Sequence, residues 1–191
     1  MAKEDRRIQK TKAAIAAALM SLLEEKDFSH ISINDIAERA NVNRGTIYFH
    51  YEDKYDLLNK LMDKKLKELK ETCQSIDLNF SPQKLEVDFC TVYRFFDENY
   101  RFFKLMLDSG APARFQEKFK ALLLNEMQRN DGFHSKDIDK EFLLQFKASA
   151  LSGVIEWWIC ENHNPTIEEM SHNTVQLFLK KADSPKTRMT L

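Results

Sequence analysis

The chain has 191 residues, a formal net charge of −1 and 31% charged side chains, which is typical of a folded globular protein. Only four Gly and four Pro interrupt it, so long helices are favoured over a β fold with many turns. It contains no run of about 18 apolar residues and no apolar signal segment at its N-terminus. We therefore expect a soluble cytoplasmic protein with no membrane span.

The three cysteines, Cys73, Cys90 and Cys160, are odd in number and far apart in the sequence. This pattern predicts reduced structural thiols and argues against a disulfide framework or a zinc site. A redox-sensing thiol is the alternative. We expect no metal and no cofactor.

A first helix is predicted over residues 6–26, where Ile15, Leu19 and Leu22 belong to an apolar stripe at helical spacing. Residues 1–12 carry five basic against two acidic side chains. Such a segment can lie beside nucleic-acid phosphates, or it can be an ordinary solvated helix start.

Two short helices joined by a tight turn are predicted over residues 33–51. Ser32 is the expected N-cap of the first helix, with Asp35 near its N3 position, and Asn43 is the expected N-cap of the second. Val42 would be the apolar plug between them. This pattern is typical of a helix-turn-helix, whose second helix lies in the DNA major groove.

The second of these helices carries side chains suited to DNA. Arg44 and Thr46 are polar and near its N-terminus, and Gly45 permits close approach. Phe49 is expected to pack inside as a hydrophobic staple, and the alternative is that it contacts DNA. The candidate DNA contacts are Ser32, Asn43, Arg44, Gly45, Thr46, Tyr48, His50, Tyr51 and Lys54. The alternative for these residues is ordinary surface decoration of a small helical domain.

A long connecting helix is predicted over residues 54–73, with Asp53 as its N-cap. Lys54 lies in its first turn, where backbone N–H groups already favour phosphate. The predicted domains are therefore an N-terminal DNA-binding domain over residues 1–53, a connecting helix over about 54–74, and a C-terminal domain over 75–191 for effector binding and dimerisation.

Residues from about 6 to 65 resemble the N-terminal domain of the TetR family of bacterial transcriptional regulators. The resemblance is carried by the Ile-Ala-x-x-Ala-x-Val core from Ile36, the Gly-Thr-Ile-Tyr-Phe-His-Tyr segment from Gly45, and the helix start Asp-Lys-Tyr-Asp-Leu-Leu from Asp53. It implies an all-α fold: a three-helix DNA-binding head with a helix-turn-helix, joined by a long helix to a larger helical bundle that dimerises.

The resemblance also implies roles for individual side chains. The family positions that match Tyr48, His50 and Lys54 typically hold phosphates, and those that match Arg44 and Thr46 lie at the base edges. The family's C-terminal part varies greatly between members, so the resemblance does not name an effector.

Helices are predicted over residues 82–98, 100–107 and 113–129; all three contain aromatic residues, and the second and third also contain Met. Such residues at helical spacing normally form a core, but they also line cavities for apolar or aromatic effectors. The candidate pocket residues are Phe89, Tyr93, Phe96, Phe103, Met106, Phe119, Leu123 and Phe146.

The segment 142–162 is apolar nearly all round, which predicts a helix buried on two sides. A final helix begins after a capping box formed by Thr166 and Glu169. Together these helices predict half of an intermolecular four-helix bundle, in an isologous dimer whose recognition helices lie about 34–36 Å apart. The candidate dimer contacts are Gly153, Trp157, Trp158, Met170 and Leu177.

The sequence contains no nucleophile elbow, phosphate-cradling Gly loop or metal-binding helix motif, so we do not expect an enzyme. We expect a homodimeric, sequence-specific transcriptional regulator bound to a palindromic operator, a repressor released by a small-molecule effector. The alternative is a co-regulator whose C-terminal domain binds a partner protein. A closed apolar cavity would favour the sensor, and an exposed aromatic patch beyond the dimer interface would favour the co-regulator.

Overall fold

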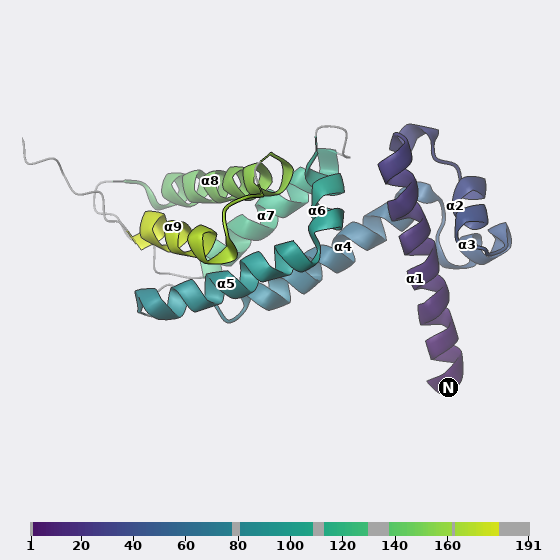
Figure 1. Ribbon diagram of the computed structural model, residues 1–191, viewed down its shortest axis with the longest axis horizontal. Coiled ribbons are helices and arrows are strands. Elements are labelled where there is room, and N and C mark those ends of the chain that lie inside the picture. The colour runs from purple at the N-terminus through teal and green to yellow at the C-terminus, as the bar shows by residue number, and fades with distance from the viewer. Residues whose placement is uncertain (1, 78–80, 109–112, 130–137, 162, 180–191) are drawn as a thin grey trace, which may run out of the picture. The chain divides into compact units, whose positions relative to one another are not determined.

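The computed structural model describes residues 2–77, 81–108, 113–129, 138–161 and 163–179. In these ranges helices are joined by turns and loops, and no strand occurs (Figure 1). The all-α prediction is therefore confirmed. The elements in chain order are α1 (Ala2–Glu25), the 3₁₀ turn η1 (Phe28–His30), α2 (Ile33–Arg39), α3 (Arg44–His50), α4 (Lys54–Cys73), α5 (Pro82–Glu98), α6 (Tyr100–Leu107), α7 (Ala113–Arg129), α8 (Lys140–Cys160) and α9 (Ile167–Leu179).

Helix ends follow the local capping signals closely. Asp53 accepts a hydrogen bond from the Asp56 N–H at 2.7 Å, and Ser81 caps α5 with Pro82 at its first position. α8 begins two residues before the predicted start because the Asp139 carboxylate accepts from the Phe142 N–H at 2.9 Å. These bonds satisfy backbone donors that have no partner within the helix.

The chain divides into two compact units. The first comprises Met1–Leu69 with Arg101–Lys118, and the second comprises Lys70–Tyr100 with Phe119–Leu191. This division differs from the sequence-based one, which assigned all of residues 75–191 to the C-terminal domain. α6 and the start of α7 belong to the first unit, where Arg101 pairs with Glu24 and Lys118 with Asp63.

The core of the first unit is aliphatic around the short helices and aromatic around α6. Ile15 and Leu19 of α1, Ile36 of α2 and Ile47 of α3 are all fully buried. Farther along the chain, the Phe102 ring packs against Phe103 and Phe115 with ring centroids 5.4 and 5.7 Å apart.

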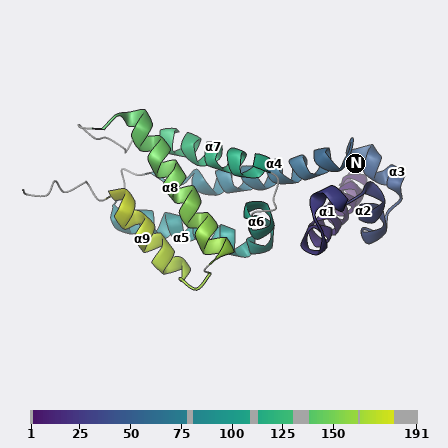
Figure 2. The same cartoon turned by 90° about the horizontal axis from the view of Figure 1, so that it is seen from above.

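The second unit is built on α5 and α9, which lie side by side, while α8 and α9 diverge from the loop that joins them (Figure 2). Tyr93 of α5 is central to this unit. Its hydroxyl bonds Thr174 of α9 at 2.7 Å, and its ring meets the Trp158 ring of α8 edge-on at 5.4 Å. The Trp158 indole N–H in turn donates to the Pro165 carbonyl at 2.9 Å, so the buried polar groups of both aromatics are satisfied.

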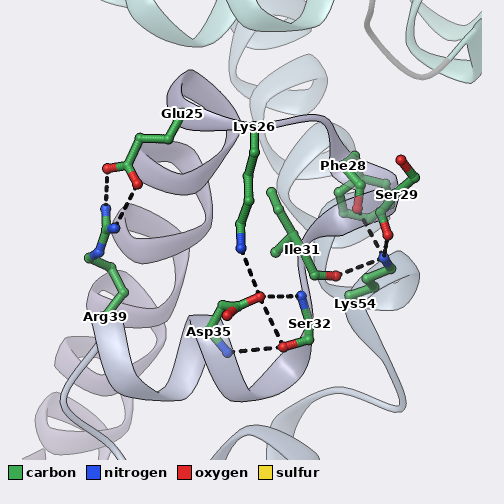
Figure 3. Close-up of polar contacts among 9 residues, drawn as sticks. All are labelled: Glu25, Lys26, Phe28, Ser29, Ile31, Ser32, Asp35, Arg39 and Lys54. Atoms are coloured by element: carbon green, nitrogen blue, oxygen red, sulfur yellow. Dashed lines mark hydrogen bonds and ion pairs between the residues drawn. The ribbon is translucent and has the colours of Figure 1, made fainter.

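The predicted capping box of α2 is confirmed. The Asp35 N–H donates to the Ser32 hydroxyl at 3.2 Å, while the Asp35 carboxylate accepts from the Ser32 N–H at 2.8 Å. The same carboxylate oxygen accepts from the Lys26 ammonium at 3.0 Å, which joins the end of α1 to the start of α2 (Figure 3). The bond from the Ser32 backbone is the main cause that lowers the pKa of Asp35 to about 2, followed by Lys26 and the Ser32 hydroxyl.

This low pKa predicts how the stability contribution of Asp35 depends on pH. The pKa of Asp35 falls from 3.8 to about 2 on folding, so its carboxylate stabilises the fold above about pH 4 and loses that effect as pH falls towards 2. Urea unfolding should therefore show Asp35→Asn to be less stable than wild type at neutral pH, by a difference that shrinks in acid. Glu38→Gln, on the same helix, is the matched control. A difference for Asp35→Asn that stays constant from neutral pH to pH 2 would contradict the assignment.

Candidate DNA interface and effector cavity

The turn between α2 and α3 is formed by a short polar segment. Asn41 has φ 52°, a left-handed conformation that Asn tolerates better than most residues and that lets the chain reverse after Ala40. Asn43 then caps α3, because its side chain accepts from the Gly45 N–H at 2.8 Å. The predicted N-cap role of Asn43 is thus confirmed, and it sets where the second helix of the motif begins.

One face of α3 is open to solvent. Ile47 is fully buried and anchors the opposite face, while Arg44 and Gly45 are exposed. The Arg44 guanidinium donates to the Tyr48 hydroxyl at 3.1 Å and lies 5.2 Å from the centre of the Tyr48 ring. Tyr48 therefore orients Arg44 as well as presenting its own hydroxyl. Thr46 is half-buried.

The prediction for Phe49 is wrong. Its side chain is 79% exposed instead of packing inside as a staple. Two residues beyond the buried Ile47, a helical side chain points about 200° away from the core. That spacing in the sequence was the signal that could have placed Phe49 on the exposed face.

His50 and Tyr51, both predicted DNA contacts, lie deeper than expected. Burial, and then the nearby Lys12 charge, lower the pKa of His50, so its imidazole is mainly neutral at pH 7. Tyr51 is buried, which raises the pKa of its phenol, and the Lys60 ammonium lies 5.4 Å from its ring. The structure therefore corrects the prediction for Tyr51, because its side chain is only 7% exposed and belongs to the core.

Lys54 is also placed differently from the prediction. Its ammonium donates to three backbone carbonyls, those of Phe28 at 2.9 Å, Ser29 at 3.0 Å and Ile31 at 2.7 Å (Figure 3).

Ser32, another predicted contact, is exposed, but its hydroxyl is held in the capping box of α2. Ion pairs occupy further basic groups of the first unit, since Arg39 binds both carboxylate oxygens of Glu25 at 2.6 and 2.8 Å.

The second unit contains an apolar cavity. Its interior volume is about 50 Å³, and part of it is open to solvent. Its apolar lining is Ile76, Phe89, Val92, Leu123, Met127, Leu151, Ile155 and Phe178. Cys73, Tyr93 and Glu126 complete the lining, which is almost wholly apolar.

Glu126 connects this cavity to the last residue of α4. Its carboxylate accepts from the Arg129 Nε and guanidinium NH₂ at 3.0 and 2.8 Å, and the same NH₂ group donates to the Cys73 carbonyl at 3.3 Å. Burial is the main cause that raises the pKa of the Cys73 thiol to about 12. The thiol is therefore protonated at neutral pH and is a poor candidate for redox sensing.

The predicted pocket residues separate into three groups. Phe89, Tyr93 and Leu123 line the cavity. Phe96 and Phe119 instead pack on each other in the core, with ring centroids 5.9 Å apart, and Phe103 and Met106 are buried in the first unit. Phe146 is 63% exposed, so the pocket prediction is wrong for these five, because aromatic content alone does not show which way a ring points.

The predicted dimer contacts separate in a similar way. Trp158 and Met170 are buried within the chain itself, so the prediction is corrected for both. Gly153 and Trp157 lie on an exposed apolar stripe of α8, which we call the α8 stripe and define as Phe142, Phe146, Ala150, Gly153 and Trp157. Leu177 of α9 is 68% exposed. A Cβ built on Gly153 meets no atom within 4 Å, so the centre of the stripe is open.

Among the described residues, no helix is both long and apolar enough to cross a bilayer.

Comparison with known proteins identifies two family regions. Residues 15–61 match the model of bacterial regulatory proteins of the tetR family, and residues 83–180 match a transcriptional regulator C-terminal region. The HTH-type transcriptional regulator YxbF of Bacillus subtilis (strain 168) is 25% identical over 182 residues, covering 91% of this chain and 46% of that protein. This chain thus spans about half the length of YxbF.

Two further relatives match over nearly their full length. The dhaKLM operon transcriptional activator DhaS of Lactococcus lactis is 22% identical over 174 residues, covering 88% of this chain and 89% of DhaS. The crystal structure of a TetR transcriptional regulator from Streptococcus agalactiae 2603V superposes with a TM-score of 0.71 at 29% identity, covering 92% of this chain and 97% of that one. The chain therefore belongs to the TetR family of bacterial helix-turn-helix transcriptional regulators.

Proposed function

We propose that the protein is a cytoplasmic, homodimeric repressor that binds a palindromic operator and releases it when an apolar effector fills the cavity of the second unit. The observation that carries the proposal is the exposed face of α3. Arg44 and Tyr48 lie together on it, and buried Ile47 and the Asn43 cap hold the helix in place. This is the arrangement that major-groove recognition by a helix-turn-helix requires.

We assign the side chains of α3 to different parts of the DNA. Arg44 and Thr46 are assigned to base edges, and Gly45 lets the backbone approach. Phe49, exposed on the same helix, suits apolar contact with a thymine methyl group or a sugar. Tyr48 and His50 are assigned to phosphates, together with exposed basic residues of α1 such as Arg7 and Lys10.

Selection from random duplexes tests the central claim, and we expect it to enrich an inverted repeat with two half-sites. Arg44→Ala should relax base preference within each half-site and cost about 1–3 kcal/mol of discrimination per base pair read. Arg94→Ala removes an equally exposed Arg from α5 and is the matched control. Recovery of no inverted repeat by the wild-type protein would refute sequence-specific operator binding.

The α8 stripe supports a homodimer. Its apolar residues follow the spacing of one helix face, with the side-chain-free Gly153 between Ala150 and Trp157. A second copy of the same stripe can cross there closely, because both helices lack a side chain at that point. We therefore assign Phe142, Phe146, Gly153, Trp157 and Leu177 to the interface.

Analytical ultracentrifugation tests this assignment. We expect a dimer at micromolar concentration, and Gly153→Leu should weaken dimerisation at least roughly tenfold by wedging the crossing helices apart. Gln83→Leu adds the same side chain at an exposed position of α5 and should leave the dimer intact. A wild-type protein that is monomeric would refute the proposed dimer. A fully dimeric Gly153→Leu protein would place the interface elsewhere.

The cavity supports effector sensing over docking of a partner protein. Eight of the residues that line it are apolar, so the effector should be largely apolar or aromatic. The Glu126–Arg129–Cys73 link gives such a ligand a route to α4. A ligand that displaces Glu126 would loosen the hold of Arg129 on the last carbonyl of α4, and α4 begins directly after the helix-turn-helix.

Leu123→Phe should test the sensor role by partly filling the cavity. Among alkanoic acids, alkyl ammonium ions and planar aromatic compounds, we expect at least one that lowers the operator affinity of the wild type. That response should be lost in Leu123→Phe and kept in Leu122→Phe, a half-buried neighbour outside the lining.

Transcription in vitro from a promoter that carries the operator should fall when the protein is added. A rise would make the protein an activator, as DhaS is described. Lack of any active compound, with a partner protein captured through the second unit, would favour the co-regulator.

A further inference from the structure

The ammonium of Lys54 is enclosed by acceptors from a different part of the first unit. The Phe28, Ser29 and Ile31 carbonyls accept at 2.9, 3.0 and 2.7 Å from it (Figure 3). A lysine ammonium has three N–H donors, so three carbonyl partners use its full donor capacity. The group is therefore occupied by backbone within the protein itself.

Aromatic rings complete the surroundings of this ammonium. Its nitrogen lies 4.9 Å from the centre of the Phe28 ring and 5.5 Å from that of the Tyr55 ring, and the two rings meet edge-on at 5.2 Å. Ring faces attract a cation within about 6 Å. The charge is thus balanced by carbonyl dipoles and two π faces, and the side chain is half-buried.

We propose that Lys54 is a positioning residue, a clamp that ties the α1–α2 connection to the first residue of α4, and that it does not neutralise a DNA phosphate in the operator complex. This inference rests on the proposed DNA binding. It departs from the phosphate role expected from the sequence, because a phosphate contact would require the ammonium to leave three carbonyls that already satisfy it.

The position of Lys54 explains what the clamp would hold. Ile31 directly precedes Ser32, the N-cap of α2, and only residues 51–53 separate α3 from Lys54. One ammonium therefore links the end of the α1–α2 connection, the start of α2 and the start of α4. With this link closed, a displacement of the first turn of α4 is passed to α2 and α3 together, and the helix-turn-helix moves as one body.

A salt series with two variants separates the clamp from a phosphate contact. Lys54→Met removes the charge and keeps the stem, whereas Lys54→Arg keeps the charge in a planar fork that cannot aim at three converging carbonyls. The clamp predicts that both variants lower Tm, weaken operator binding roughly 10- to 100-fold and leave the slope of log K against log salt unchanged. The phosphate role predicts a slope smaller by about 0.9 per lost contact in Lys54→Met and near-normal binding by Lys54→Arg.

Lys10→Met is the matched control, since Lys10 is exposed on α1 and assigned to phosphate. It should reduce the salt slope and leave Tm unchanged. In the free protein, amide hydrogen exchange over residues 31–36 should be about tenfold faster in Lys54→Arg than in wild type. If both Lys54 variants are unfolded while Lys10→Met folds, the clamp is supported, because a phosphate contact adds nothing to the stability of the free protein.

Three results would overturn the clamp: unchanged Tm in both variants, a reduced salt slope in Lys54→Met with rescue by Lys54→Arg, or unchanged exchange over residues 31–36. Failure of the wild type to bind any operator would instead refute the proposed function. In that case Tm and exchange in the free protein would still decide whether Lys54 holds the α1–α2 connection.

Discussion

The helix on which DNA recognition depends has only seven residues, Arg44–His50, and so does α2 before it. Isolated helices shorter than about 12–15 residues are marginal in water, so neither can form without help from its surroundings. The help comes from two side-chain N-caps, from the left-handed Asn41 in the turn and from the fully buried Ile36 and Ile47. Because those same contacts determine which face of α3 is exposed, stability and recognition depend on one set of residues.

The DNA-binding region carries no net positive charge. Residues 1–54 carry nine basic and nine acidic side chains, so the DNA-binding region has no excess positive charge to attract phosphate. Several of its cations are engaged within the protein: Lys26 with Asp35, Arg39 with Glu25, and Lys54 with backbone carbonyls. The remaining exposed cations lie mainly on α1 and at Arg44. Doubling this small set in a dimer is therefore the natural route to useful operator affinity.

The second unit combines an apolar cavity with polar links between its helices. A cavity lined almost wholly by hydrocarbon gives little directional specificity, and Glu126 and Tyr93 are lining residues whose side chains also carry polar groups. Both are already tied to the framework, Glu126 through Arg129 to the Cys73 carbonyl and Tyr93 through Thr174 to α9. In the proposed sensor, a ligand that shifted either residue would move the helices to which it is bonded, which is the physical requirement for coupling a cavity to DNA binding.

The sequence by itself determined the features that depend on residues three or four positions apart. Helix starts at Ser32, Asn43 and Thr166 were predicted correctly, because a cap is a local hydrogen bond between a side chain and a nearby N–H. The family and the all-α fold followed from the same local patterns. Only the tertiary structure decided that Phe49 and Phe146 are exposed, that Tyr51, Trp158 and Met170 are buried, and that Lys54 faces carbonyls. Composition shows that a side chain is apolar or charged, but which partner it meets depends on how whole helices pack, and that is set by contacts far apart in the chain.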